Sequence, residues 1–148
     1  MSDVHRYVFR TEWHLDAGPD AVYAALAHVP DYPQWWPEVR ATRELEDGVG
    51  EIRCRSMLPY DLVFVASRVV EDPVTRTLRA HLDGDLIGTS EWTITANGSG
   101  TLAVFDEDVR VGKAAVRHAG RLARPVLRFN HDRMMRSGER GLHRYLDG

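Results

Sequence analysis

The sequence predicts an α+β fold: a seven-stranded antiparallel sheet followed by a long C-terminal helix, with two short helices after the first strand. Seven segments are typical of strands, and in the first and the last of them apolar and polar side chains alternate with a period of two, as in strands with one buried face. Six of these segments lie between Val39 and Val111 and are separated by short turns, which requires antiparallel pairing. After Gly112 the apolar residues recur every three or four positions, which is typical of a helix.

The first strand is expected over residues 4–15, and its alternation predicts a buried face made of Tyr7, Phe9, Thr11, Trp13 and Leu15. Gly18 or Asp20 is expected to cap the short helix that follows. The apolar face of this helix consists of Val22, Ala25, Leu26 and Val29. Prolines then bracket residues 31–36, which suits one helical turn better than a strand.

Turn residues such as Asp47-Gly48, Asp83-Gly84 and Asn97-Gly98 divide the next part of the chain into six strands. The strands are expected at residues 39–45, 50–57, 60–70, 78–82, 87–96 and 101–111. The final helix is expected over residues 125–146, because Pro125 suits a first helical position. No repeat or linker divides the sequence, so residues 1–148 are expected to form a single domain.

Composition narrows the function classes. The longest segment without a charged side chain has 14 residues, Trp92 to Phe105, and contains a turn, so no membrane insertion is expected. Cys54 is the only cysteine and the N-terminus has no signal-peptide pattern, which predicts a cytoplasmic protein. The net charge is −3, and the basic residues near the C-terminus recur at helical spacing, as on a solvated helix face. We therefore expect no nucleic-acid partner.

Several segments resemble one known superfamily, and together they span nearly the whole chain. They are residues 13–17 with 19–23, the Asp-Tyr-Pro-Gln-Trp-Trp-Pro segment 31–37, and residues 58–60, 84–88 and 123–132. With the order of the elements, they resemble the START-like (SRPBCC) superfamily, and within it the bacterial polyketide cyclase/dehydrase-like branch. The resemblance implies a helix-grip fold, in which a bent sheet wraps around the C-terminal helix and leaves an apolar cavity between them. It carries over no catalytic residue and implies no cofactor.

Strand alternation makes Glu107 the main candidate for a polar group in such a cavity. It shares a face with Ala103, Phe105, Val109 and Val111. A desolvated carboxylate there could transfer a proton or bind a hydroxyl or amine of a ligand. The alternative is a wet position near the rim of the sheet or an ion pair with an arginine such as Arg133.

Asn130 and His131 interrupt the apolar stripe of the last helix. Each could reach the cavity, or could form a structural hydrogen bond with strand backbone. Glu107 and His131 are therefore the candidate catalytic residues. The seven histidines show no spacing typical of metal ligands, so no metal site is expected.

The remaining candidate ligand-binding residues are mainly aromatic: Phe9, Trp13, Trp35, Trp36, Tyr60, Phe64, Trp92, Phe105 and Met134. The alternative is that these aromatic side chains pack in the hydrophobic core. For Trp35 and Trp36, which lie between prolines, a gate at the cavity mouth is the alternative.

Three functions remain open at this point. The first is a binding protein that holds a small hydrophobic or aromatic ligand, lipid or polyketide-like, between sheet and helix. The second is a polyketide cyclase, aromatase or dehydratase-type enzyme that uses the same cavity, with Glu107, His131 or a tyrosine as the proton-transfer group. The third is an interaction protein whose basic helix face binds a partner. Neither the ligand nor the oligomeric state follows from the sequence.

Overall fold

The computed structural model describes residues 6–56, 61–112 and 124–147. In these ranges the strands are β1 (Arg6–Leu15), β2 (Val39–Glu46), β3 (Val49–Cys54), β4 (Leu62–Asp72), β5 (Thr77–Gly84), β6 (Leu86–Asn97) and β7 (Gly100–Val111). The helices are α1 (Pro19–Ala27), the 3-10 helix η1 (Val29–Asp31), α2 (Tyr32–Trp35) and α4 (Arg124–Asp147). The predicted order of elements is confirmed.

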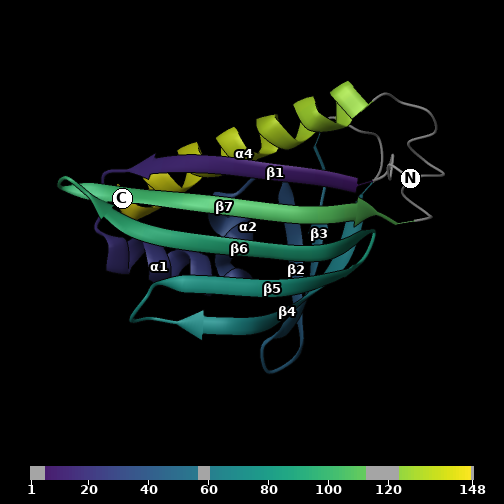
Figure 1. The fold of residues 1–148 in the computed structure, drawn as a ribbon, viewed down its shortest axis with the longest axis horizontal. Helices are drawn as coiled ribbons and strands as arrows, with labels where there is room; N and C mark the ends of the chain where they lie inside the picture. The colour runs from purple at the N-terminus through teal and green to yellow at the C-terminus, as the bar shows by residue number, and fades with distance from the viewer. Residues whose placement is uncertain (1–5, 57–60, 113–123, 148) are drawn as a thin grey trace.

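The seven strands form one antiparallel sheet in the order β1-β7-β6-β5-β4-β3-β2. Each strand from β2 to β7 pairs with the next along the chain, and β1 pairs with β7 at one edge. Irregular register in β2 and in β4 favours local bending. Figure 1 shows β2 and β3 turned steeply away from the direction of β4 to β7, so the sheet is strongly bent.

The first helix begins as expected but ends earlier. Gly18 is the N-cap with φ −69°, and Pro19 occupies the first turn. Val22 and Leu26 are completely buried, which confirms the predicted apolar face at these positions. Val29 does not belong to this helix, because α1 ends at Ala27 and Val29 begins η1. The physical reason is Pro30, which has no backbone N–H to donate to the carbonyl of Leu26; that carbonyl accepts a hydrogen bond from the Tyr32 hydroxyl instead.

Helix α4 lies beside β1 along the concave side of the sheet (Figure 1). Two glycines allow its close approach to α2 and β1. A Cβ atom on Gly141 would lie 1.7 Å from the backbone oxygen of Trp35, and one on Gly138 would lie 2.6 Å from the Trp36 ring. The carbonyl of Met134 accepts a hydrogen bond from Trp36 Nε1 at 2.9 Å. The position of α4 therefore depends on backbone contact as well as on apolar packing.

Aromatic residues form the centre of the main core. The Trp13 ring contacts those of Trp35, Trp36 and Trp92, with centroids 6.3, 5.3 and 4.8 Å away. Leu142 of α4 is completely buried in the same core. Such ring pairs add about 0.5–1.5 kcal/mol each to the free energy of area burial. This core joins β1, β6, α2 and the C-terminal half of α4.

Strand boundaries agree with the sequence prediction to within a few residues wherever they are described. The predicted end of one strand at Met57 and the start of the next at Tyr60 lie outside the described residues. Among the helices of the described ranges, none has the length and apolar character required to cross a membrane.

Candidate functional site

A cavity of about 460 Å³ lies between the concave face of the sheet, α2 and α4. Its size is within the range of about 300–1,000 Å³ that is typical of small-molecule sites. Most of its wall is apolar. Nine residues named as candidates from the sequence line it: Phe9, Trp36, Phe64, Trp92, Phe105, Glu107, Asn130, His131 and Met134.

Two of the other candidate residues lie in the hydrophobic core and not in the cavity wall. Trp13 and Trp35 are 1% and 4% exposed and belong to the packed core, so neither lines the cavity. Their rings pack against α4 and α2, which leaves them behind the cavity wall. Trp36 is also buried, but it contributes to the wall, and a gating role for it stays a prediction. Tyr60 lies outside the described residues.

Glu107 and His131 form the main polar contact inside the cavity. Glu107 Oε1 lies 3.0 Å from His131 Nε2, and the two side chains are 10% and 17% exposed. Glu107 comes from β7 and His131 from α4, so this pair joins the sheet to the helix. The partner of Glu107 is therefore a histidine from the helix, and not the arginine considered from the sequence.

The second nitrogen of His131 has no hydrogen-bond partner among the residues that the structure describes. Nδ1 is buried, and the nearest carboxylate oxygen, on Asp132, is 4.0 Å away, beyond hydrogen-bond distance. The imidazole ring stacks on Phe9, with ring centroids 3.7 Å apart. When the imidazole is neutral, Nε2–H donates to Glu107 and Nδ1 carries the lone pair.

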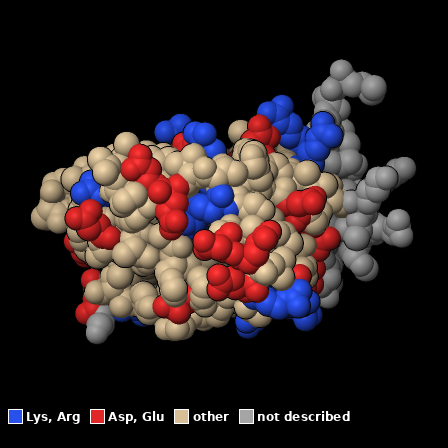
Figure 2. Space-filling view, turned by 90° about the horizontal axis from the view of Figure 1, so that it is seen from below, with Lys and Arg blue, Asp and Glu red and all other residues tan. Residues whose placement is uncertain are grey.

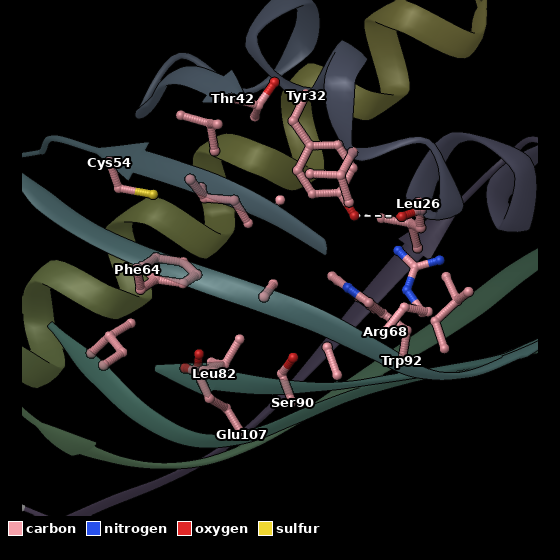
Figure 3. A pocket seen from close by; sticks show the side chains of 18 of the residues that line it. Leu26, Tyr32, Thr42, Cys54, Phe64, Arg68, Leu82, Ser90, Trp92 and Glu107 are labelled. Atoms are coloured by element: carbon pink, nitrogen blue, oxygen red, sulfur yellow. Dashed lines mark hydrogen bonds between the residues drawn. The ribbon is translucent and has the colours of Figure 1, made fainter. Parts of the chain in front are cut away.

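A row of inward side chains crosses the sheet at the level of Glu107. In the strand register Arg68 of β4 lies opposite Ala80 of β5, Ala80 opposite Ser90 of β6, and Ser90 opposite Glu107 of β7. Phe9 of β1 continues the row on the other side of Glu107. Figure 3 shows Ser90 and Glu107 together on the strands that form one wall, with Arg68 farther along it. Three strand spacings separate Arg68 from Glu107, up to about 14 Å along the sheet.

The polar groups near Arg68 are already bound within the protein. Its guanidinium donates to Glu71 Oε1 at 3.1 Å and to the carbonyl of Ala27 at 3.3 Å. The Tyr32 hydroxyl donates to the carbonyl of Leu26 (Figure 3). Burial raises the pKa of Tyr32 well above its usual range, although the positive charge of Arg68 acts in the opposite direction. This phenol therefore stays protonated at neutral pH.

Cys54 lies in the wall of the cavity as a protonated thiol. Burial, and secondarily the negative charge of Glu107, raises the pKa of Cys54 to about 12. The nucleophilic form of cysteine is the thiolate. A thiol with this pKa is a poor nucleophile at neutral pH, so Cys54 acts as a small apolar side chain of the wall.

Sequence reasoning missed several cavity residues: Tyr7, Tyr32, Arg68 and Ser90. Strand alternation places Tyr7 on the buried face with Phe9 and Trp13, but it did not single out Tyr7 as a residue of the cavity. For Arg68 and Ser90 the pattern is weaker, since a polar residue in a strand is usually taken as facing solvent. The register that brings them level with Glu107 depends on several successive strand pairings.

One group of potential metal ligands lies away from this cavity, at the end of α4. Ligand atoms of Asp16, His143 and Asp147 lie within 4.8 Å of one another, and both aspartates are exposed. His143 Nε2 donates to the carbonyl of His14 at 2.7 Å. Exposed groups of this kind occur widely without a metal, and the absence of a metal site stays a prediction.

Comparison with known proteins gives a family but no curated relative. Residues 6–146 match the model of the family described as polyketide cyclase / dehydrase and lipid transport. No curated protein sequence matches the chain.

Solved structures share the fold at low sequence identity. The aromatase/cyclase Zhui from Streptomyces sp. R1128 has a TM-score of 0.79 and 18% identity, over 97% of this chain and 94% of that one. A START superfamily protein from Mycobacterium smegmatis has a TM-score of 0.74 and 17% identity, over 97% of both chains. The major latex-like protein 151 of Panax ginseng has a TM-score of 0.70 and 10% identity, over 95% and 97%. These structures share with this chain the fold in which a bent sheet surrounds α4, and the family match over nearly the whole chain shows that this protein belongs to the polyketide cyclase / dehydrase and lipid transport family.

Proposed function

We propose that the protein binds one small hydrophobic or aromatic molecule, lipid or polyketide-like, in the cavity between the sheet and α4. The observation that carries this proposal is the cavity itself, about 460 Å³ with a mainly apolar wall. A few convergent polar groups in an apolar pocket are typical of small-molecule sites. The Glu107–His131 pair supplies such groups here.

Isothermal titration calorimetry with a panel of fatty acids and polycyclic aromatic compounds tests this proposal. We expect one-to-one binding of at least one class with a negative heat-capacity change, because apolar surface is buried. Ala80 lies on the cavity wall at the centre of the row, so Ala80→Phe should fill part of the space and weaken binding by about tenfold or more.

The control for this variant is Ala41→Phe. Ala41 is exposed on β2 and does not line the cavity, so this variant should bind as the unchanged protein does. No binding of any panel member to the unchanged protein, or equal affinities of the two variants, would contradict the proposal.

The Glu107–His131 contact favours a second candidate, an enzyme of the cyclase, aromatase or dehydratase type. A carboxylate and an imidazole 3.0 Å apart can pass a proton between themselves and a substrate held in the cavity. In that mechanism one group removes a proton from a carbon or hydroxyl of the substrate, and its conjugate acid returns a proton to the leaving or accepting oxygen. The cavity would supply the remaining catalysis by holding a flexible substrate in a folded conformation.

Glu107→Gln separates the enzyme from the binding protein. For an enzyme, this change should lower turnover by about 100-fold or more while affinity stays within a few-fold, because only the titratable proton is lost. The measurement uses the molecule that the protein retains on purification from its own host, identified by native mass spectrometry, with the product followed by mass. Undiminished turnover in the variant would remove Glu107 from the mechanism.

The cytoplasmic location and the absence of a nucleic-acid partner or a cofactor stay predictions. The proposed partner is the small apolar ligand alone.

A further inference from the structure

Glu107 lies at the centre of an aromatic wall. Phe9 of β1 lies opposite Glu107 in the strand register, and Phe105 precedes Glu107 by two residues on the same face of β7. The rings of Phe105 and Trp92 lie 4.5 Å apart, and all three of these aromatic residues line the cavity. The Phe9 ring already stacks on His131, whereas Trp92 and Phe105 offer apolar surface for a ligand whose cationic group forms a charge-assisted hydrogen bond with Glu107.

Part of the Glu107 carboxylate remains available to a ligand. His131 contacts Oε1, and Oε2 accepts no hydrogen bond from any residue in the described ranges. The hydroxyl of Ser90, which lies directly opposite on β6, also has no hydrogen bond to a described side chain or backbone group. When His131 is neutral, the Glu107–His131 pair carries one negative charge. A donor with positive charge would complement this pair better than a neutral donor would.

The neighbouring rings already accept one cation. The guanidinium carbon of Arg128 lies 5.4 Å from the centroid of the Phe9 ring and 5.7 Å from that of the Tyr7 ring. Arg128 itself is exposed on α4 and forms no ion pair with Glu107 among the described residues. The buried carboxylate of Glu107 therefore has no ion pair with this arginine.

Three exposed lining residues at the hairpin between β2 and β3 are acidic, Glu44, Glu46 and Asp47, and we call them the mouth carboxylates; Arg43 and Arg79 are exposed lining residues as well. These three carboxylates have no ion pair with a residue that the structure describes. The lining arginines are better compensated: Arg43 pairs with Glu51, Arg79 with Glu91, and Arg68 with Glu71. Figure 2 shows acidic side chains near the middle of the face that it views, with basic side chains beside them. A field of this sign attracts cations and repels free carboxylates.

From this arrangement we infer that the cavity selects an amine, an aryl or arylalkyl ammonium whose nitrogen donates to Glu107 while its apolar part lies against Trp92 and Phe105. The inference rests on the proposed function, since it specifies the ligand class of the same cavity. Arg68 does not oppose it, because its guanidinium is engaged by Glu71 and by the carbonyl of Ala27, and β4 is separated from β7 by two intervening strands.

Three ligands of nearly equal size test this inference by calorimetry: naphthylethylamine, naphthylethanol and naphthylacetate. We expect the amine to bind about tenfold or more tightly than the alcohol, because its hydrogen bond to Glu107 is charge-assisted. The acetate should bind most weakly. In Glu107→Gln the amine should lose about tenfold or more, and the alcohol should change little. Glu12→Gln is the matched control, because Glu12 is exposed on the outer side of β1 and does not line the cavity.

The possible results separate this inference from the proposed function. Equal binding of amine and alcohol, or preference for the acetate, would overturn the amine inference and leave the cavity as a general apolar site. An amine preference that persists unchanged in Glu107→Gln would assign selection to the mouth carboxylates and overturn the role of Glu107. No binding of any of the three ligands, or of the apolar panel, would overturn the proposed function itself.

Discussion

A chain that ends before Pro125 should lose cooperative unfolding and should aggregate or remain molten. Helix α4 supplies Met135 and Leu142 to the core, and it covers the inner face of a sheet whose wall is mainly apolar. Without α4 that face would meet water as one wide apolar surface, which soluble monomers rarely tolerate. Near-ultraviolet circular dichroism and thermal unfolding would measure the loss, together with increased binding of a hydrophobic dye.

The control is Arg136→Ala in the full chain, since Arg136 is exposed on α4. This variant should unfold within about 0.5 kcal/mol of the unchanged protein. A soluble truncated chain with a cooperative transition would show that the sheet is stable without α4.

Gly141→Ala should destabilise the protein by about 3 kcal/mol, in the upper part of the range for overpacked cores. On an open helix surface the same change stabilises by about 1 kcal/mol, because alanine has the higher helix propensity. Here the added Cβ would lie 1.7 Å from the Trp35 carbonyl oxygen, so α4 or α2 must move. Urea unfolding measures the change in the free energy of unfolding.

Gly18→Ala is the matched control for this prediction. No heavy atom lies within 4 Å of a Cβ at Gly18, and its φ of −69° is open to alanine. We expect a loss of about 1 kcal/mol or less, from the weaker N-cap. Equal stabilities of Gly141→Ala and the unchanged protein would mean that α4 does not approach Trp35 as closely as the structure shows.

Much of the fold was predictable because its signals are local. The period of two along β1 and β7 identifies the inner face of each strand, and it placed Phe9 and Glu107 on that face before any pairing was known. Tight turns between consecutive strands leave antiparallel pairing as the sterically accessible arrangement. Helix α1 ends two residues before Val29, which the apolar pattern had included, because this pattern does not show the effect of Pro30 on the helix.

The candidate site was predictable only in part. Alternation indicated that Glu107 is inward, but its partner depends on where α4 crosses the sheet, and His131 follows Glu107 by 24 residues. The helical pattern placed Asn130 and His131 on opposite sides of one stripe, with nothing to decide which would reach β7. Likewise, Trp13 and Trp35 were candidates for ligand binding because they are aromatic, but packing against α4 and α2 buries both side chains in the core.

The sequence by itself therefore determined which segments form helices and strands and which face of each strand points inward. It also determined that an acidic residue, Glu107, lies on the inner face of the last strand. Only the tertiary structure decided which side chains became core and which became cavity wall, and which partner Glu107 received. The physical reason is that periodicity and turn chemistry act over a few residues of one segment. The contact of Gly141 with the Trp35 carbonyl and the row from Arg68 to Glu107 depend instead on how a bent sheet and a helix fit together.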